Sequence, residues 1–216
     1  MYKTFSFAAA LLLAALWAAP ASAASHYVSG MAGISWLNDM DSISDAPDSL
    51  STSYTYDFDS GITLLGAAGC DYDGYRLEAE IGYQQNELKS ETYLVDGELD
   101  TLYDIDKGDI SVLSLMANGY YDFDLGGFEF YATAGIGVAQ VLIDDLSYAD
   151  DADEFSTSET TLAWQAGAGL AAPIADGVKL DLRYRYFATT DFTISAWEEH
   201  ASIASHSLLL GVRVGL

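Results

Sequence analysis

The chain has 216 residues, of which 33 are acidic and 8 are lysine or arginine, so its formal net charge is −25. That charge excludes nucleic-acid binding, which requires a basic surface. Half of the residues are hydrophobic, and tyrosine and phenylalanine are plentiful, so a disordered acidic protein is excluded as well.

The N-terminal segment predicts export. Lys3 gives the start of the chain a positive charge, residues 5–19 form an apolar run, and Ala21-Ser22-Ala23 is a small-residue cleavage site. We therefore expect a signal peptide at residues 1–23 and one domain at residues 24–216. An N-terminal anchor is disfavoured because the apolar run is shorter than the span of about 20 residues that a membrane helix needs. No later segment holds about 18 uninterrupted apolar residues, so no transmembrane helix is expected.

Segments of alternating character recur along the rest of the chain. The clearest is residues 178–187, where valine, leucine and tyrosine alternate with lysine, aspartate and arginine. Because the side chains of a strand alternate between its faces, one face of this segment is apolar and the other is charged. The register of the second segment stays open, because glycine and alanine occupy both of its faces. The pattern predicts eight strands, at residues 26–36, about 62–72, 75–85, about 109–123, 128–142, about 160–172, 178–187 and 205–216.

The connections between these strands alternate in length. Short ones follow the second, fourth and sixth strands at 73–74, 124–127 and 175–177, and their Asp-Gly and Gly-Gly pairs favour tight hairpins. Long ones follow the other strands, at about 37–60, 86–108, 143–159 and 190–204. This organisation predicts an all-β fold: an eight-stranded antiparallel up-and-down transmembrane β-barrel with short periplasmic turns and long extracellular loops.

A soluble barrel with its apolar face inward is the alternative that alternation alone leaves open. Three features favour the membrane. Strands of about 10 residues suit a tilted crossing, the apolar face is almost free of charge, and it carries aromatic residues near both rims, as interface anchoring predicts. These aromatic residues are Tyr72, Tyr75, Tyr121, Phe123, Phe128 and Phe130 by the short turns, and Trp36, Tyr83, Trp164 and Tyr186 by the long connections.

Charged residues on the polar strand faces are expected to meet inside the barrel. An eight-stranded barrel is just wide enough for side chains to fill, so opposite charges there should pair. We expect Asp122 and Glu129 to join them near the short turns. The favoured interpretation is structural filling of the barrel, and the alternative is a selective pore or gate. The predicted lumen ion-pair network comprises Arg76, Glu78, Glu80, Lys179, Asp181, Arg183, Arg185 and Arg213.

Most of the acidic residues fall in the long connections, which hold 24 of the 33 when Asp109 is counted. The plain interpretation is a solvated, repulsive surface. Sharper ones are binding of divalent cations, bridging to lipopolysaccharide phosphates, or pairing with a basic host ligand. Oxygen clusters suit a cation such as Ca²⁺, but the spacing of a calcium loop is absent, so this signal is weak. We assign no metal and no cofactor. The possible cation-binding loop residues are Asp104, Asp106, Asp109, Asp150, Asp151, Asp153 and Glu154.

No catalytic residue is predicted. His206 and Ser207 are neighbours on one strand and should point to opposite faces, so they cannot form a nucleophile and base pair. His200, beside two glutamates and with His206, has the residue types of a metal site, but such loop combinations are common by chance. The chain is therefore expected not to be an enzyme.

Several segments also resemble the opacity-type outer-membrane barrels, which belong with the small barrels of outer-membrane protein A and X type. The resemblance covers essentially the whole chain after residue 23 except the loops. It implies a mostly monomeric, eight-stranded barrel at a Gram-negative cell surface, with relatives that serve in adhesion, as antigens or as structural components. The segments are Tyr-Arg-Leu-Glu-Ala-Glu at 75–80, Ala-Asn-Gly-Tyr-Tyr-Asp-Phe at 117–123, Ala-Gly-Ile-Gly-Val at 134–138, Leu-Arg-Tyr-Arg-Tyr-Phe at 182–187, and residues 206–216.

Together these observations predict a non-catalytic outer-membrane surface protein. Its acidic extracellular loops would serve adhesion, host or environment recognition, or envelope integrity, and a narrow porin-like channel for small solutes is the alternative. The expected partners are outer-membrane lipid and lipopolysaccharide, with a host or environmental ligand at the loops. Aromatic residues among the loop acids could contact such a ligand or pack the loops together: Tyr54, Tyr56, Tyr93, Tyr103 and Phe155.

Overall fold

A computed structural model describes residues 24–38, 40–44, 52–95, 98–148, 155–194 and 199–216. The predicted signal peptide at 1–23 lies outside the described residues.

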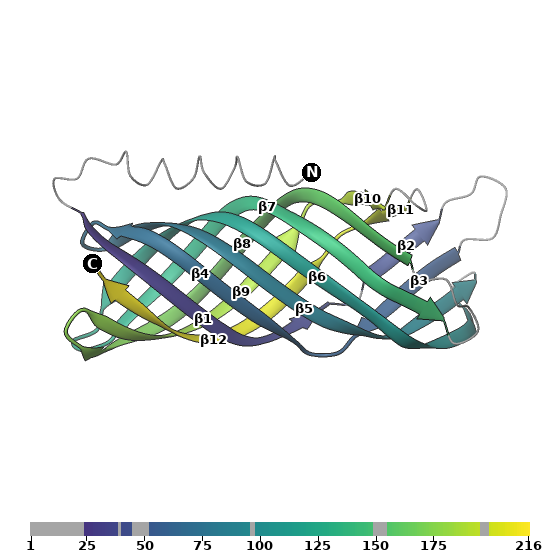
Figure 1. Ribbon diagram of the computed structural model, residues 1–216, viewed down its shortest axis with the longest axis horizontal. Coiled ribbons are helices and arrows are strands. Elements are labelled where there is room, and N and C mark those ends of the chain that lie inside the picture. The colour runs from purple at the N-terminus through teal and green to yellow at the C-terminus, as the bar shows by residue number, and fades with distance from the viewer. Residues whose placement is uncertain (1–23, 39, 45–51, 96–97, 149–154, 195–198) are drawn as a thin grey trace.

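Eight antiparallel strands close into a barrel (Figure 1), which confirms the predicted fold class. Each strand pairs with the next around the wall, and the first and last, β1 and β12, pair with each other over Tyr27↔Gly215 to Leu37↔Ser205. Closure leaves the eight-stranded wall without a free edge. The eight strands are β1 (Ser25–Leu37), β4 (Gly61–Asp71), β5 (Tyr75–Val95), β6 (Glu98–Asp124), β7 (Glu129–Tyr148), β8 (Phe155–Ala175), β9 (Val178–Thr189) and β12 (Ala204–Gly215).

The three tight turns lie at one end of the barrel, together with the start of β1 and the end of β12 (Figure 1). In the turn between β4 and β5, Asp73 and Gly74 have φ values of 63° and 112°. A two-residue hairpin of type I′ needs positive φ at both central positions. The Asp-Gly pair therefore forms this turn, as the sequence predicts, because both residues adopt the positive φ that the turn requires.

At the opposite end the strands continue into the segments expected to be loops. β5 and β6 pair as far as Val95↔Glu98, so the predicted long loop at 86–108 is wrong and is a hairpin extension instead. In the sequence, Asp96-Gly97 between them is a hairpin signal that favours such an extension over a loop. Shorter strands occupy two further connections. In the first, β2 (Met40–Ser44) pairs with β3 (Thr52–Phe58), and β3 also pairs with β5. In the second, β10 (Phe192–Ile194) and β11 (Glu199–Ala201) form a separate two-stranded sheet.

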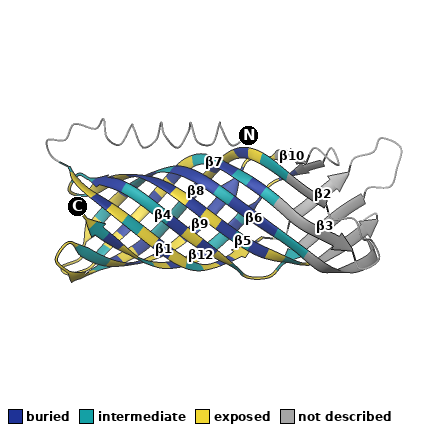
Figure 2. Ribbon diagram, in the orientation of Figure 1, coloured by how far each residue is buried: buried dark blue, intermediate teal, exposed yellow. Residues whose placement is uncertain are grey.

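Burial alternates along the barrel strands (Figure 2). Large apolar side chains such as Leu77, Ile136 and Leu182 are exposed on the outside. In β4, Ile62 and Leu64 are exposed while Thr63 and Leu65 are buried, which settles the register left open above. Among the described residues, no helix has the length and apolar character needed to cross a membrane.

Candidate functional site

The predicted network residues lie inside the barrel. Seven of the eight are between 1% and 4% exposed, and the exception is Lys179, whose side chain is 37% exposed near the short turns. They come from β5, β9 and β12, because the inward positions of these strands carry charged residues. Closure of the sheet brings these three strands around one lumen.

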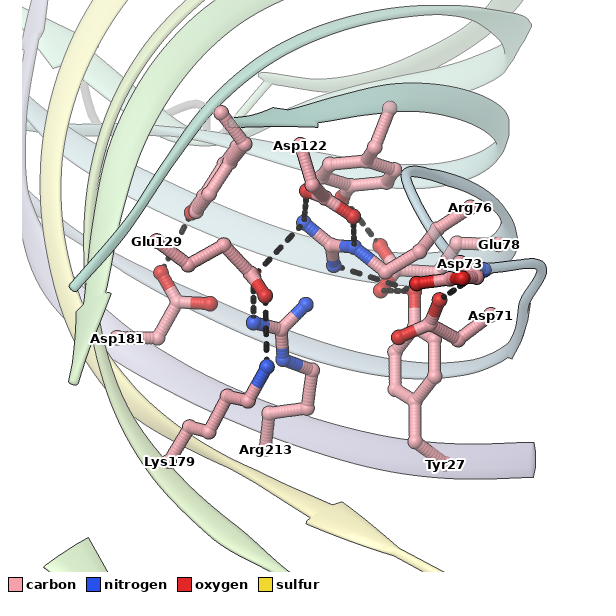
Figure 3. Close-up of polar contacts among 12 residues, drawn as sticks. Tyr27, Asp71, Asp73, Arg76, Glu78, Asp122, Glu129, Lys179, Asp181 and Arg213 are labelled. Atoms are coloured by element: carbon pink, nitrogen blue, oxygen red, sulfur yellow. Dashed lines mark hydrogen bonds and ion pairs between the residues drawn. The ribbon is translucent and has the colours of Figure 1, made fainter. Parts of the chain in front are cut away.

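The first group of ion pairs lies toward the short turns (Figure 3). Arg76 donates two hydrogen bonds to Asp122, from Nε at 2.7 Å and from Nη2 at 2.8 Å. Glu129 accepts from Lys179 Nζ at 2.6 Å and also from Arg213 Nη2. Two carboxylates therefore hold three cations, and they connect β5, β6, β7, β9 and β12 across the interior.

The second group lies deeper in the lumen and is arranged around Glu80. Arg183 Nη1 donates to Glu80 Oε2 at 2.9 Å, and Gln165 Nε2 donates to Oε1 at 2.9 Å. Arg185 Nη1 stands 3.9 Å from the same carboxylate, and Arg183 Nη2 is 4.0 Å from Glu78. These residues are buried, so their charges are stabilised by one another and by hydrogen bonds rather than by bulk water.

Three tyrosines that are absent from the predicted network complete it. Tyr27 and Tyr120 donate to the two oxygens of Glu78 at 2.9 and 2.5 Å, and Tyr131 donates to Asp181 at 2.5 Å. The Arg76 guanidinium carbon lies 4.1 Å from the centre of the Tyr120 ring, within the range of cation–π attraction. All three occupy inward positions of their strands, and strand parity alone would have placed them in the lumen.

Toward the loops, the interior is apolar rather than charged. Phe187, Met116 and Ile203 are each at most 2% exposed. Ile203 lies between β11 and β12, and its backbone exchanges hydrogen bonds of 2.9 Å with Thr189 of β9. We name this cluster the apolar plug; its buried members are Leu37, Ile110, Val112, Met116, Ala139, Val141, Ala163, Phe187, Ala201 and Ile203.

The sequence also carries a signal for the apolar plug. Residues 110–116 read Ile-Ser-Val-Leu-Ser-Leu-Met, so β6 is apolar on both faces here instead of alternating. A strand with two apolar faces is one that is covered on both sides. In a membrane barrel, this indicates apolar filling of the lumen at that height.

The predicted cation-binding loop residues are not brought together in the described structure. Asp109 lies in β6, whereas the side chains of Asp104 and Asp106 and all of Asp150, Asp151, Asp153 and Glu154 lie outside the described residues. Within the described part of the chain, no group of three or more His, Cys, Asp or Glu side chains is arranged to hold a metal ion. His206 and Ser207 occupy consecutive positions of β12, and Ser207 is fully buried on the inner face.

An apolar outer wall around a charged lumen, closed without an edge, is the arrangement that lets β-strands cross a bilayer. The protein is an outer-membrane β-barrel of a Gram-negative cell. The family model described as "Outer membrane protein beta-barrel domain" matches residues 6–214, and the chain belongs to that family.

The chain is similar in sequence to outer membrane protein PagN of Salmonella typhimurium, with 27% identity over 97% of this chain and 98% of that protein. It is 28% identical to a candidate adhesin of Rickettsia conorii, over 59% of this chain and 54% of that protein. Among solved structures it is similar to Neisserial surface protein A, with a TM-score of 0.55 and 19% identity over 88% of this chain and 97% of that one. The structural likeness shows the fold.

Proposed function

We propose that this protein is a non-catalytic surface protein whose loop end binds a ligand on another surface, so that it serves in adhesion or recognition. The barrel is the membrane-embedded support. Extended strands such as β5 and β6 carry the ligand-binding segments away from the membrane, and binding specificity belongs to those segments.

The observation that carries this proposal is the filling of the lumen. The buried ion-pair network fills the half nearer the short turns, and the apolar plug fills the half nearer the loops. Phe187 and Glu80 are each 1% exposed, so neither layer is open to solvent. Side chains packed in this way leave solute passage without a wide path.

The charge of the loop end indicates the chemistry of the ligand. Of the 33 acidic residues, 24 belong to the predicted connections at this end, with Asp109 counted among them. Such a surface attracts basic partners and repels acidic ones, most strongly at low ionic strength. The name of the Rickettsia conorii relative, as a candidate adhesin, adds support for an adhesive role. We therefore propose a ligand with a basic surface.

Loop shortening tests the proposal. In the variant, the β5–β6 extension at 88–108 is replaced by Asn-Gly, so that the paired residues Glu87 and Asp109 flank a two-residue turn. We expect the variant to insert and keep its heat-modified gel shift, because the barrel below is unchanged, but to lose most binding of bacteria to host cells. The matched control is Asp124→Asn at the short-turn end. Undiminished cell binding by a correctly folded loop-shortened protein would contradict the proposal.

A narrow channel is the second candidate, favoured by the charged lumen and by a hollow of about 380 Å³ at the short-turn mouth that Asp122, Glu129 and Lys179 help to line. Planar-bilayer recordings separate the two functions. We expect no regular single-channel steps from the wild-type protein. Regular steps that disappear in Glu78→Gln or Arg185→Gln would establish the channel instead.

A further inference from the structure

The outer wall carries a polar pair within its apolar surface. Tyr184 of β9 and His206 of β12 share a hydrogen bond of 2.6 Å between Tyr184 Oη and His206 Nδ1. When the tyrosine hydroxyl donates to Nδ1, the proton of the neutral imidazole is on Nε2. Among the described residues, Nε2 has no hydrogen-bond partner, so it remains available as a donor.

Aromatic rings surround this pair. Trp36 and Tyr186 are the strand partners of His206 on its two sides, in β1 and β9. The Tyr186 ring centre lies 5.1 Å from that of His206 and 5.3 Å from that of Trp164 in β8. The group thus spans four adjacent strands near the loop end of the wall, at the level where aromatic side chains meet the membrane surface.

The side chains next to this pair on the wall carry no charge. The strands that flank β12 face His206 with the uncharged side chains of Trp36, Tyr184 and Tyr186, of which only the two tyrosines can titrate. On the described parts of β1, β8, β9 and β12, no outward position holds a carboxylate. An anion bound at Nε2 therefore meets no repelling charge on this part of the wall.

We propose that Tyr184, His206 and the surrounding rings bind the phosphorylated sugar headgroup of the outer-leaflet glycolipid. The wall around them contacts lipid, and the lipid that covers the outer leaflet of a Gram-negative outer membrane carries phosphate on glucosamine. The imidazole donates from Nε2 to a phosphate oxygen, a charge-assisted hydrogen bond. The faces of Trp36 and Tyr186 pack on the sugar. This site is on the wall, so it is independent of ligand binding at the loops.

The test compares two lipids on the purified, folded barrel. Native mass spectrometry measures the fraction of protein that retains bisphosphorylated lipid A, and the fraction that retains the same lipid without its phosphates. We expect the wild-type protein to prefer the phosphorylated lipid about tenfold, the usual effect of one hydrogen bond to a charged group. His206→Phe should abolish this preference, and Tyr184→Phe, which frees the imidazole to rotate, should reduce it.

The matched control is His26→Phe, since His26 is exposed at the short-turn end of β1 and its loss should leave the preference unchanged. The heat-modified gel shift verifies that each variant is folded. Equal retention of the two lipids by the wild-type protein, or a preference that survives in His206→Phe, would overturn the proposal. Displacement of lipid A by an equal concentration of inorganic phosphate would also overturn it, because the site would then not require the glycolipid.

Discussion

Arg183 contacts two carboxylates and a tyrosine in the barrel interior. It donates to Glu80 at 2.9 Å and to Tyr131 Oη at 3.2 Å, and it lies 4.0 Å from Glu78. Its side chain is 3% exposed, so water cannot replace these contacts. The energetic importance of such a group lies in what its removal leaves behind, namely buried charge without a partner.

Arg183→Ala should therefore lower the temperature of the heat-modified gel shift. We expect destabilisation of about 3–5 kcal/mol, the usual effect of breaking a buried ion pair. Lys179→Ala is the matched control, because Lys179 also pairs with a carboxylate but is partly exposed, and its loss should change stability by less than about 1 kcal/mol. An unchanged gel shift in Arg183→Ala would show that the network does not hold the barrel together.

The strands and turns follow local sequence closely. Each of the eight predicted segments falls, to within one residue, inside one barrel strand, and the Asp-Gly turn between β4 and β5 has the positive φ values that its residue types permit. The loop ends of β5, β6, β7 and β8 were predicted as loops, because polar and charged residues there resemble a loop in composition. The backbone of these segments still pairs with the neighbouring strands, because pairing satisfies the backbone N–H and C=O groups whatever side chains the segments carry.

Gly74→Val tests the turn by itself. A Cβ at Gly74 would meet no atom within 4 Å, so the substitution acts only through backbone strain at a φ of 112°. We expect a loss of about 1–3 kcal/mol in the free energy of unfolding, measured by urea titration in lipid vesicles. Asp73→Asn, at the neighbouring position with a φ of 63°, should be neutral because asparagine tolerates this conformation. Equal free energies of unfolding for the two variants would show that the backbone conformation at Gly74 does not contribute to the stability of the barrel.

At the scale of the whole molecule, the outer surface of the barrel faces lipid, whereas polar and apolar side chains fill its interior. Leu182 represents the outer surface: it is 44% exposed and pairs with Leu170 and Leu210 in the middle of the wall. The same strand places Arg183, the next residue, in the lumen. Consecutive side chains thus require opposite surroundings, with apolar contact outside the wall and polar contact inside it.

Leu182→Arg should destabilise the inserted barrel by about 2–4 kcal/mol, because it places a charge near the bilayer midplane. Equilibrium unfolding from vesicles measures the change. Asp176→Arg, in the exposed turn after β8, adds the same side chain in water and should change stability little. If the two substitutions had equal effects, the outward face of β9 would not be in contact with the hydrocarbon layer.

The sequence by itself determined the number of barrel strands, the inward and outward faces of all of them except β4, the short turns and the lipid-facing surface. These are local properties, because a strand's period of two and a turn's φ requirements act over a few neighbouring residues. Only the tertiary structure decided which inward side chains meet. Arg183 and Glu80 are 103 residues apart, and their contact depends on how strand tilt and register close the sheet. Strand parity places the three tyrosines in the lumen, but their hydrogen bonds to Glu78 and Asp181 depend on the same closure, since these partners are 42 to 51 residues away in sequence.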